Sequence, residues 1–220
     1  ELPIDAVRTG SAVGVSLLVG STLDEWKLLG PSDPSIYALN TNSLVERVAA
    51  TVGKDAVRIV KTYEEAVPLR GTEATPTETF LAIETDRVFR MPALLLAEAQ
   101  GQQNAPAYNY LFTWPSSAMG GMLGSCHALE LCFVFGTIDA TNSRDLCGSG
   151  SSCDALEEAI QESWLAFAKT GDPSNPKVGN WLPYGTDRQT MILGESIGSE
   201  SAPFETERLA WEGVQKVGSL

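Results

Sequence analysis

His127 is the only histidine in the 220-residue chain, and it lies in a mainly apolar segment that runs from Gly124 to Gly136. Among unperturbed side chains, only imidazole changes its charge near neutral pH, so this residue is the natural candidate for a general base. A histidine beside apolar residues can equally be a hydrogen-bonded structural residue. The residue alone leaves both interpretations open, and the neighbouring sequence has to decide between them.

A histidine base needs a partner that fixes its tautomer and stabilises the imidazolium ion, and carboxylates serve best. The acidic pair Asp24 and Glu25 follows an apolar run at residues 15–20 that has the length of a buried strand. In α/β proteins, the carboxyl ends of strands carry the active-site loops. An Asp-Glu pair on its own usually lies on the solvated surface. It indicates a catalytic acid only in combination with the His127 segment.

Hydrophobic periodicity and capping residues predict the elements that must position these side chains. Capping boxes are expected at Ser43 with Glu46 and at Asp154 with Glu157. The order of strand, several helices, strand, helix, strand, helix predicts an α/β fold with a mostly parallel sheet and flanking helices. Helices are expected over residues 43–53, 55–65, 77–84, 92–100, 154–169 and 204–212, and strands over residues 15–20, 108–114 and 189–193.

Composition limits the classes of partner. A net charge of −13 has the wrong sign for holding a phosphate backbone or anionic lipid, so neither nucleic acid nor membrane is expected as a partner. No apolar run is long enough for a membrane span, and the first residues do not resemble a signal peptide. Because the chain does not start with Met, we expect it to begin inside a longer gene product, with a cytoplasmic or a secreted location both open.

Four cysteines are too few for a scaffold built on disulfides. Cys147 and Cys153 flank a Gly-Ser loop at residues 148–152, and either a small disulfide or two free thiols fits this spacing. One histidine and no C-x-x-C pair leave too few ligands for a zinc site. No metal or other cofactor is therefore expected.

Five segments match one known family in its own order. Residues 20–25 fit the pattern G-x₃-D-E, and residues 127–136 fit H-G-x-E-[LI]-x-[FY]-V-F-G except at Ala128. Residues 110–114, 167–173 and 181–184 match as well. The chain thus resembles the type-B carboxylesterase and lipase family of the α/β-hydrolase fold, which includes the cholinesterases. The resemblance implies hydrolysis of small-molecule carboxylic esters by acyl transfer, with Glu25 as the catalytic acid and His127 as the base of a Ser-His-Glu triad.

Two positions near His127 qualify the match. Ala128 stands where the family usually has Gly, and its methyl group is expected to shift the backbone beside the imidazole slightly. Glu130 matches the family's second acid, which implies a supporting role in the site. A surface salt bridge is the alternative interpretation of Glu130.

The resemblance also implies a serine on a G-x-S-x-G elbow that precedes both partners, and no such elbow precedes Glu25. Gly194–Gly198 fits the pattern with Ser196 at its centre, but it follows His127 and the last expected strand, so we interpret it as a turn. The family's H-G-G-G oxyanion segment is also not found, and each lost oxyanion donor costs about a hundredfold or more in rate. We expect residues 1–220 to be the C-terminal portion of a single carboxylesterase domain that has little or no activity without its N-terminal half.

Two other functions remain open at this point. The chain can be a non-catalytic cholinesterase-like binding module, or a self-contained hydrolase that uses Ser196. Retention of both Glu25 and His127 favours the enzyme. A sheet that lacks its neighbouring strands has an open edge, so we expect the chain to be joined to its N-terminal half or self-associated.

Overall fold

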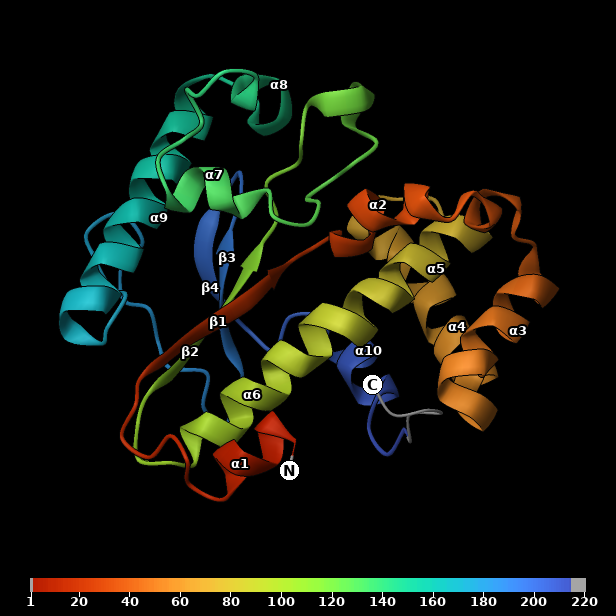
Figure 1. The fold of residues 1–220 in the computed structure, drawn as a ribbon, viewed down its shortest axis with the longest axis horizontal. Helices are drawn as coiled ribbons and strands as arrows, with labels where there is room; N and C mark the ends of the chain where they lie inside the picture. The colour runs from red at the N-terminus through yellow and green to blue at the C-terminus, as the bar shows by residue number, and fades with distance from the viewer. Residues whose placement is uncertain (1, 215–220) are drawn as a thin grey trace.

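A computed structural model describes residues 2–214 and places a four-stranded sheet at the centre of the fold (Figure 1). The strand order is β1 (Leu17–Thr22), β2 (Ala107–Phe112), β3 (Gln189–Leu193) and β4 (Ile197–Ser201). The first three strands are parallel to one another and β4 is antiparallel to β3. The predicted α/β class with a mostly parallel sheet is confirmed.

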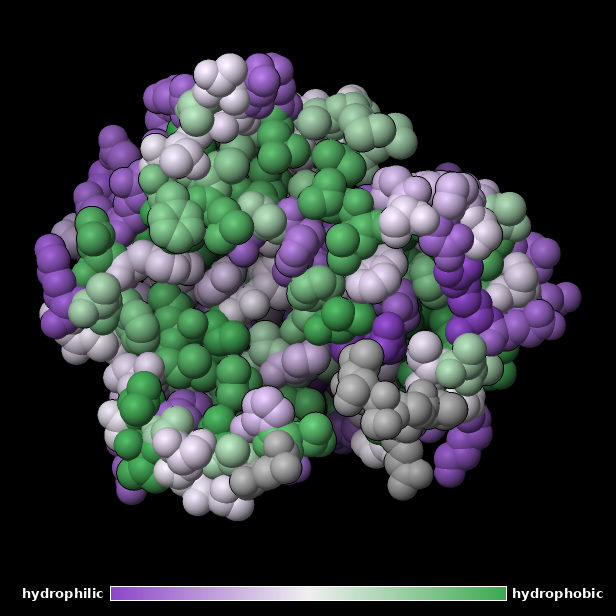
Figure 2. Space-filling view, in the orientation of Figure 1, coloured by the Kyte–Doolittle hydropathy of each residue, from purple (hydrophilic) through white to green (hydrophobic). Residues whose placement is uncertain are grey.

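Within residues 2–214, β1 pairs with β2 only, so its other edge is open. The viewer of Figure 1 faces this edge, with α6 below it and α7 above it. Figure 2, seen from the same side, shows many hydrophobic side chains between these two helices. The edge of the sheet that carries Glu25 is therefore both unpaired and surrounded by apolar surface.

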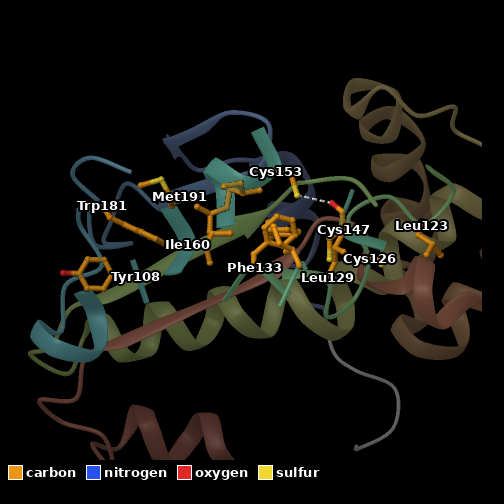
Figure 3. Close-up of a cluster of buried hydrophobic side chains, with 14 residues drawn as sticks. Tyr108, Leu123, Cys126, Leu129, Phe133, Cys147, Cys153, Ile160, Trp181 and Met191 are labelled. Atoms are coloured by element: carbon orange, nitrogen blue, oxygen red, sulfur yellow. Dashed lines mark hydrogen bonds between the residues drawn. The ribbon is translucent and has the colours of Figure 1, made fainter. Parts of the chain in front are cut away.

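Helices lie on both faces of the sheet (Figure 1). Helix α6 packs against β1 and β2 on one face, where Met91, Leu94 and Ala97 contribute to a small apolar cluster. Helices α7 and α9 cover the other face, and their apolar side chains form the larger cluster of Figure 3 together with Phe112, Trp181 and other residues. The helices are α1 (Pro3–Arg8), α2 (Glu25–Leu29), α3 (Thr41–Val52), α4 (Ala56–Ala66), α5 (Pro76–Thr85), α6 (Met91–Gly101), α7 (Glu130–Val134), α8 (Ser143–Cys147), α9 (Ser151–Thr170) and α10 (Glu205–Ala210).

The long connection between β1 and β2 forms a helical unit with its own core, to the right in Figure 1. Helices α3, α4 and α5 bury Leu44, Ile59 and Ile83 against one another. Short 3₁₀ turns connect the helices at Gly30–Ser32, Pro34–Ala38, Gly53–Asp55 and Val67–Arg70, and another lies at Ala118–Gly121. A π-helical turn, Asp86–Arg90, joins α5 to α6. The two helices predicted on either side of this turn are thus parts of one continuous helical segment.

Several predicted boundaries are wrong for identifiable reasons. The first strand begins at Leu17, because pairing with β2 starts there, and it continues through Thr22 alongside β2. Helix α3 begins earlier than predicted. The side chain of Asn40 accepts a hydrogen bond from the backbone N–H of Ser43, and the Ser43 hydroxyl accepts one from the backbone N–H of Asn40. Asn40 therefore takes the capping role assigned to Ser43.

Helix α9 also begins earlier than predicted. Its first residue is Ser151, and Gly150 precedes it without a side-chain cap. Asp154 pairs with Arg144 at 2.8 Å instead of capping the helix, and Glu157 accepts from the backbone of Ile138 at 3.4 Å. Ser151 and Ser152, predicted to lie in the loop, are therefore helical, and Asp154 lies in the first turn of α9 rather than at its cap.

Candidate active site

The structure brings Glu25 and His127 together from positions 102 residues apart in the sequence. Nδ1 of His127 lies 2.6 Å from Oε2 of Glu25. The other carboxylate oxygen, Oε1, accepts from the backbone N–H of Thr22 at 2.8 Å. An ionised carboxylate can only accept hydrogen bonds, so the proton of the neutral imidazole is on Nδ1. Nε2 is then left with a lone pair that can accept a proton.

Burial differs between the two partners in a way that suits their chemistry. The Glu25 side chain is 5% exposed, whereas the His127 side chain is 41% exposed. A buried carboxylate is costly unless its oxygens are hydrogen-bonded, and both oxygens of Glu25 have partners. The arrangement is thus a fixed, buried acid that orients an imidazole accessible from outside.

Glu25 and His127 are held by the ends of neighbouring parallel strands. Glu25 is the first residue of α2, and Leu23 and Asp24 separate it from the end of β1 at Thr22. The loop before His127 is tied to the end of β2, because the Ser125 hydroxyl donates to the carbonyl of Phe112 at 2.7 Å. A single parallel bridge between Asp24 and Cys126 extends the pairing beyond the strands. The strand ends therefore set the separation between acid and base.

Ala128 adopts a left-handed backbone conformation with a φ of +65°. Glycine reaches this region without the steric cost that a Cβ atom adds. The departure from the family's usual Gly thus places a residue with a side chain in a conformation that favours glycine, one position after the imidazole.

Glu130 is the first residue of α7 and is partly buried. Burial raises the pKa of Glu130, and the nearby Glu25 carboxylate raises it further, against the lowering effects of a backbone hydrogen bond and of His127. Its Oε2 atom is buried without a hydrogen-bond partner within residues 2–214. Among residues 2–214, Glu130 does not form the surface ion pair of the alternative interpretation, and its supporting role stays a prediction.

An aromatic side chain that the sequence did not single out lies against the imidazole. The ring centroid of Phe89 is 5.0 Å from that of His127, and the ring centroid of Trp26 is 6.3 Å from that of Phe89. Phe89 belongs to the π-helical turn, a feature that often marks functional sites. No sequence pattern distinguishes this turn from an ordinary helix. The position of Trp26 directly after Glu25 is the one signal in the sequence for an aromatic side chain near the site.

Tyr110 of β2 lies close to Glu25 and Glu130. Burial raises its pKa, and the carboxylates of Glu130 and Glu25 raise it further. The side chain also packs edge-on against Trp164 of α9, with centroids 5.2 Å apart. The motif at residues 110–114 thus contributes a protonated phenol to the neighbourhood of Glu25.

Ser196 lies in the bend between β3 and β4 and is exposed. The predicted turn is present at this position, and a strand follows it, whereas a nucleophile elbow leads from a strand into a helix. β2 separates β3 from β1, the strand that leads into Glu25. Within residues 2–214, no hydrogen bond joins Ser196 to His127.

The four cysteines are free thiols in this structure. Cys147 and Cys153 are fully buried, and the Cys153 thiol donates to the Cys147 carbonyl at 3.6 Å. Burial raises the pKa of both thiols. Across the described part of the chain, no group of three His, Cys, Asp or Glu side chains is placed to hold a metal ion, and no helix is long and apolar enough to cross a membrane.

A family model described as "Carboxylesterase family" matches residues 1–209. The chain belongs to the carboxylesterase family. The predicted resemblance is confirmed, and both the match at Glu25 and the match at His127 lie inside the matched residues.

Relatives in the carboxylesterase family are esterases and lipases. The chain is 32% identical over 211 residues to para-nitrobenzyl esterase of Bacillus subtilis (strain 168), which covers 94% of the chain and 40% of that protein. It is 31% identical over 172 residues to bile salt-activated lipase of Rattus norvegicus, which covers 67% of the chain and 28% of that protein. The chain thus spans well under half the length of these relatives.

Solved structures agree with the family assignment. The crystal structure of the Geobacillus stearothermophilus carboxylesterase EST55 at pH 6.2 superposes with a TM-score of 0.84 at 31% identity. That alignment covers 96% of this chain and 43% of the EST55 chain. The predicted α/β-hydrolase fold of carboxylesterases is therefore confirmed.

Proposed function

We propose that residues 1–220 are the C-terminal portion of a single carboxylesterase domain and supply the acid and the base of a serine carboxylic ester hydrolase. The 2.6 Å hydrogen bond between Nδ1 of His127 and Glu25 carries this proposal. It leaves Nε2 as the proton acceptor and provides a buried carboxylate to stabilise the imidazolium. The family match and the esterase relatives support the same reaction class.

In the proposed mechanism, a serine of the N-terminal half attacks the carbonyl carbon of a small-molecule ester. Nε2 of His127 takes the serine proton and then delivers it to the leaving alcohol oxygen, which gives an acyl-enzyme. Glu25 holds the imidazole in orientation and stabilises its charged form. Water, activated by the same nitrogen, attacks the acyl-enzyme, releases the carboxylic acid and returns the proton to serine. No cofactor takes part in this sequence.

The open edge of β1 is the proposed docking place for the N-terminal half. β1 leads directly to Glu25 and lacks a neighbour on one side within residues 2–214. Val15, just before β1, is an exposed hydrophobic side chain next to this edge. A parallel strand added there pairs the free backbone groups and brings its own carboxyl end beside Glu25.

Reconstitution tests the proposal. Mixing or co-expressing this chain with the N-terminal half of its esterase is expected to restore hydrolysis of a para-nitrophenyl ester, with little or no hydrolysis by either part alone. His127→Gln is expected to abolish the restored activity, because a glutamine side chain cannot accept and return the proton. Unchanged activity in this variant contradicts the assignment of the base.

Two further results separate this function from the alternatives. Complete absence of hydrolysis after the two halves assemble, with both folded, favours a non-catalytic binding module. An organophosphate that labels Ser196 in the isolated chain favours a self-contained hydrolase, whereas we expect no label at that exposed bend. Both experiments use mass spectrometry or an ester assay on purified protein.

A further inference from the structure

Asp24, the residue before Glu25, contacts the His127 loop through both its backbone and its side chain. Its backbone N–H donates to the carbonyl of Ser125 at 2.9 Å. Its carboxylate Oδ2 accepts from the backbone N–H of Ser125, also at 2.9 Å. The two bonds fix both polar backbone groups of Ser125, two residues before the imidazole. We call this pair of bonds the Asp24 bracket.

The loop fits closely around the Asp24 carboxylate. Gly124 has a φ of +54°, and a Cβ atom built on it would overlap Oδ2 of Asp24. Glycine is therefore required at this position for two independent reasons, the left-handed backbone and the close approach of the carboxylate. The contact shows that the side chain of Asp24 sits directly against the backbone that leads to His127.

Lys27 contacts the other oxygen of the Asp24 carboxylate, and Glu78 in turn contacts Lys27. Nζ of Lys27 lies 3.2 Å from Oδ1 of Asp24 and 3.3 Å from Oε2 of Glu78 in α5. Burial alone would lower the pKa of Lys27, but the two carboxylates outweigh it and the pKa is raised, so the ammonium group stays charged. The orientation of Asp24 is thus restrained by Lys27 of α2, which is itself held by Glu78 of α5.

The loop needs such a constraint because its own sequence supplies little rigidity. Gly120, Gly121 and Gly124 all have positive φ values, and glycine has more conformational freedom to lose than any other residue. The His127 side chain is 41% exposed, so packing restrains it on one side only. A productive triad needs its groups held to within about 0.5 Å.

We propose that Asp24 is a positioning residue, whose bracket on Ser125 keeps His127 within hydrogen-bonding distance of Glu25. Asp24 touches neither the imidazole nor the reacting atoms and acts through the loop backbone. Its contribution to catalysis rests on the proposed function of Glu25 and His127. Its effect on the geometry does not, because the hydrogen bond between these two side chains is a property of the chain itself.

The single histidine gives a direct spectroscopic test. In the 220-residue chain labelled with ¹⁵N-histidine, the ring of His127 is the only source of imidazole signals. The Nδ1 proton held against Glu25 is expected to resonate downfield of the amide region, with ring nitrogen shifts of one tautomer. In Asp24→Ala, we expect this proton signal to be lost and the nitrogens to report a mixture of tautomers.

Matched variants separate positioning from folding. Asp24→Asn keeps an oxygen that accepts from Ser125, so it is expected to retain the downfield signal. Asp154→Ala removes an acid from a surface ion pair with Arg144 and serves as the control that leaves the signal unchanged. Circular dichroism of each variant reports whether the fold is intact.

An unchanged Nδ1 signal in folded Asp24→Ala overturns the proposal, and the 2.7 Å bond from Ser125 to Phe112 then suffices to hold the loop. If Asp24→Ala does not fold, Gly124→Ala decides, because its methyl group displaces the carboxylate while leaving Asp24 in place. Gly121→Ala introduces a Cβ atom at another left-handed position but meets nothing within 4 Å, so it is the control for backbone strain. Loss of the signal in Gly124→Ala but not in Gly121→Ala supports the bracket, and retention of the signal in Gly124→Ala contradicts it. The two proposals can also fail separately. If the reconstituted enzyme is inactive but the Nδ1 signal still depends on Asp24, the proposed function is wrong and the positioning role of Asp24 stands.

Discussion

At the scale of single residues, Glu25 provides the sharpest prediction for activity. Glu25→Gln keeps the shape of the side chain but lets its amide donate to Nδ1, which favours the wrong tautomer of His127. We expect kcat of the reconstituted enzyme to fall by about 10⁴-fold, as for the equivalent change in a Ser-His-Asp triad. Steady-state ester hydrolysis measures this. Glu65→Gln, on the exposed face of α4, is the control, and equal rates in both variants contradict the role of Glu25.

Ala128 gives a prediction about stability at the same scale. Because its φ is +65°, Ala128→Gly relieves the steric cost of a left-handed residue. We expect the free energy of unfolding to rise by about 1 kcal/mol in urea titrations. Ala49→Gly, inside α3, is the matched control and should lower it by about 1 kcal/mol. A loss of stability in Ala128→Gly is the result that counts against this explanation.

At the scale of elements, close contact between β1 and β2 restricts Gly20. A Cβ atom built on Gly20 would overlap the backbone carbonyl of Tyr110, which cannot rotate away. Gly20→Ala is therefore expected to lower the free energy of unfolding by about 3 kcal/mol. Gly198→Ala in β4 is the control, since a Cβ there meets nothing within 4 Å. Similar free energies of unfolding for the two variants contradict the steric argument.

The π-helical turn that carries Phe89 is anchored by a buried ion pair. Asp86 accepts two bonds from Arg90, at 2.7 and 2.6 Å, and a third from the hydroxyl of Tyr63. Trp211, which follows α10, donates to the same hydroxyl at 2.8 Å. The network thus links α4, the turn and the C-terminal helix behind the candidate site.

Acid titration tests this network. Burial alone would raise the pKa of Asp86, but Arg90 outweighs it and the pKa is lowered from its ordinary 3.8. A depressed folded pKa adds stability above about pH 3.8 that is lost as the pH falls through the folded value. Arg90→Met leaves Asp86 buried without its main counter-charge, and at pH 6 we expect a loss of about 3–5 kcal/mol.

The sign of the pH dependence provides the check. In Arg90→Met, burial is expected to raise the pKa of Asp86 above its ordinary value of 3.8. The loss of stability in this variant should therefore shrink as the pH falls through the raised pKa, because the buried carboxyl group then becomes protonated and neutral. Urea unfolding between pH 3 and pH 7 measures this difference. Arg8→Met, at an exposed ion pair with Asp5, is the control. The same acid dependence in Arg90→Met and wild type contradicts the assignment.

At the scale of the whole molecule, the open edge of β1 predicts association. Unpaired strand groups beside exposed hydrophobic side chains favour pairing with another chain. We expect the isolated chain to self-associate in a concentration-dependent manner and to form a one-to-one complex when its N-terminal half is added. Analytical ultracentrifugation distinguishes these states. A monodisperse monomer in dilute solution is the outcome that contradicts this expectation.

Most helices and strands could be predicted from the local sequence, because each depends on its own hydrophobic periodicity and on the capping and turn residues at its ends. The strand at residues 189–193 and the helices around residues 56–66 and 76–85 are found where apolar spacing placed them. Predicted boundaries were wrong where a tertiary contact, rather than the local sequence, determined the conformation. Asp154 pairs with Arg144 instead of capping α9, and the π-helical turn that holds Phe89 has no distinguishing pattern in the sequence.

The types of residue available for chemistry were determined by the sequence alone: one imidazole, an acid after the first strand, and motifs in the order of one family. The tertiary structure decided which of them meet. Parallel pairing of β1 with β2 sets the two strand ends side by side, and the bonds from Asp24 to Ser125 bring Glu25 and His127 to 2.6 Å. Contacts between residues about 100 positions apart depend on how separate elements pack, and no local pattern along the chain encodes that distance.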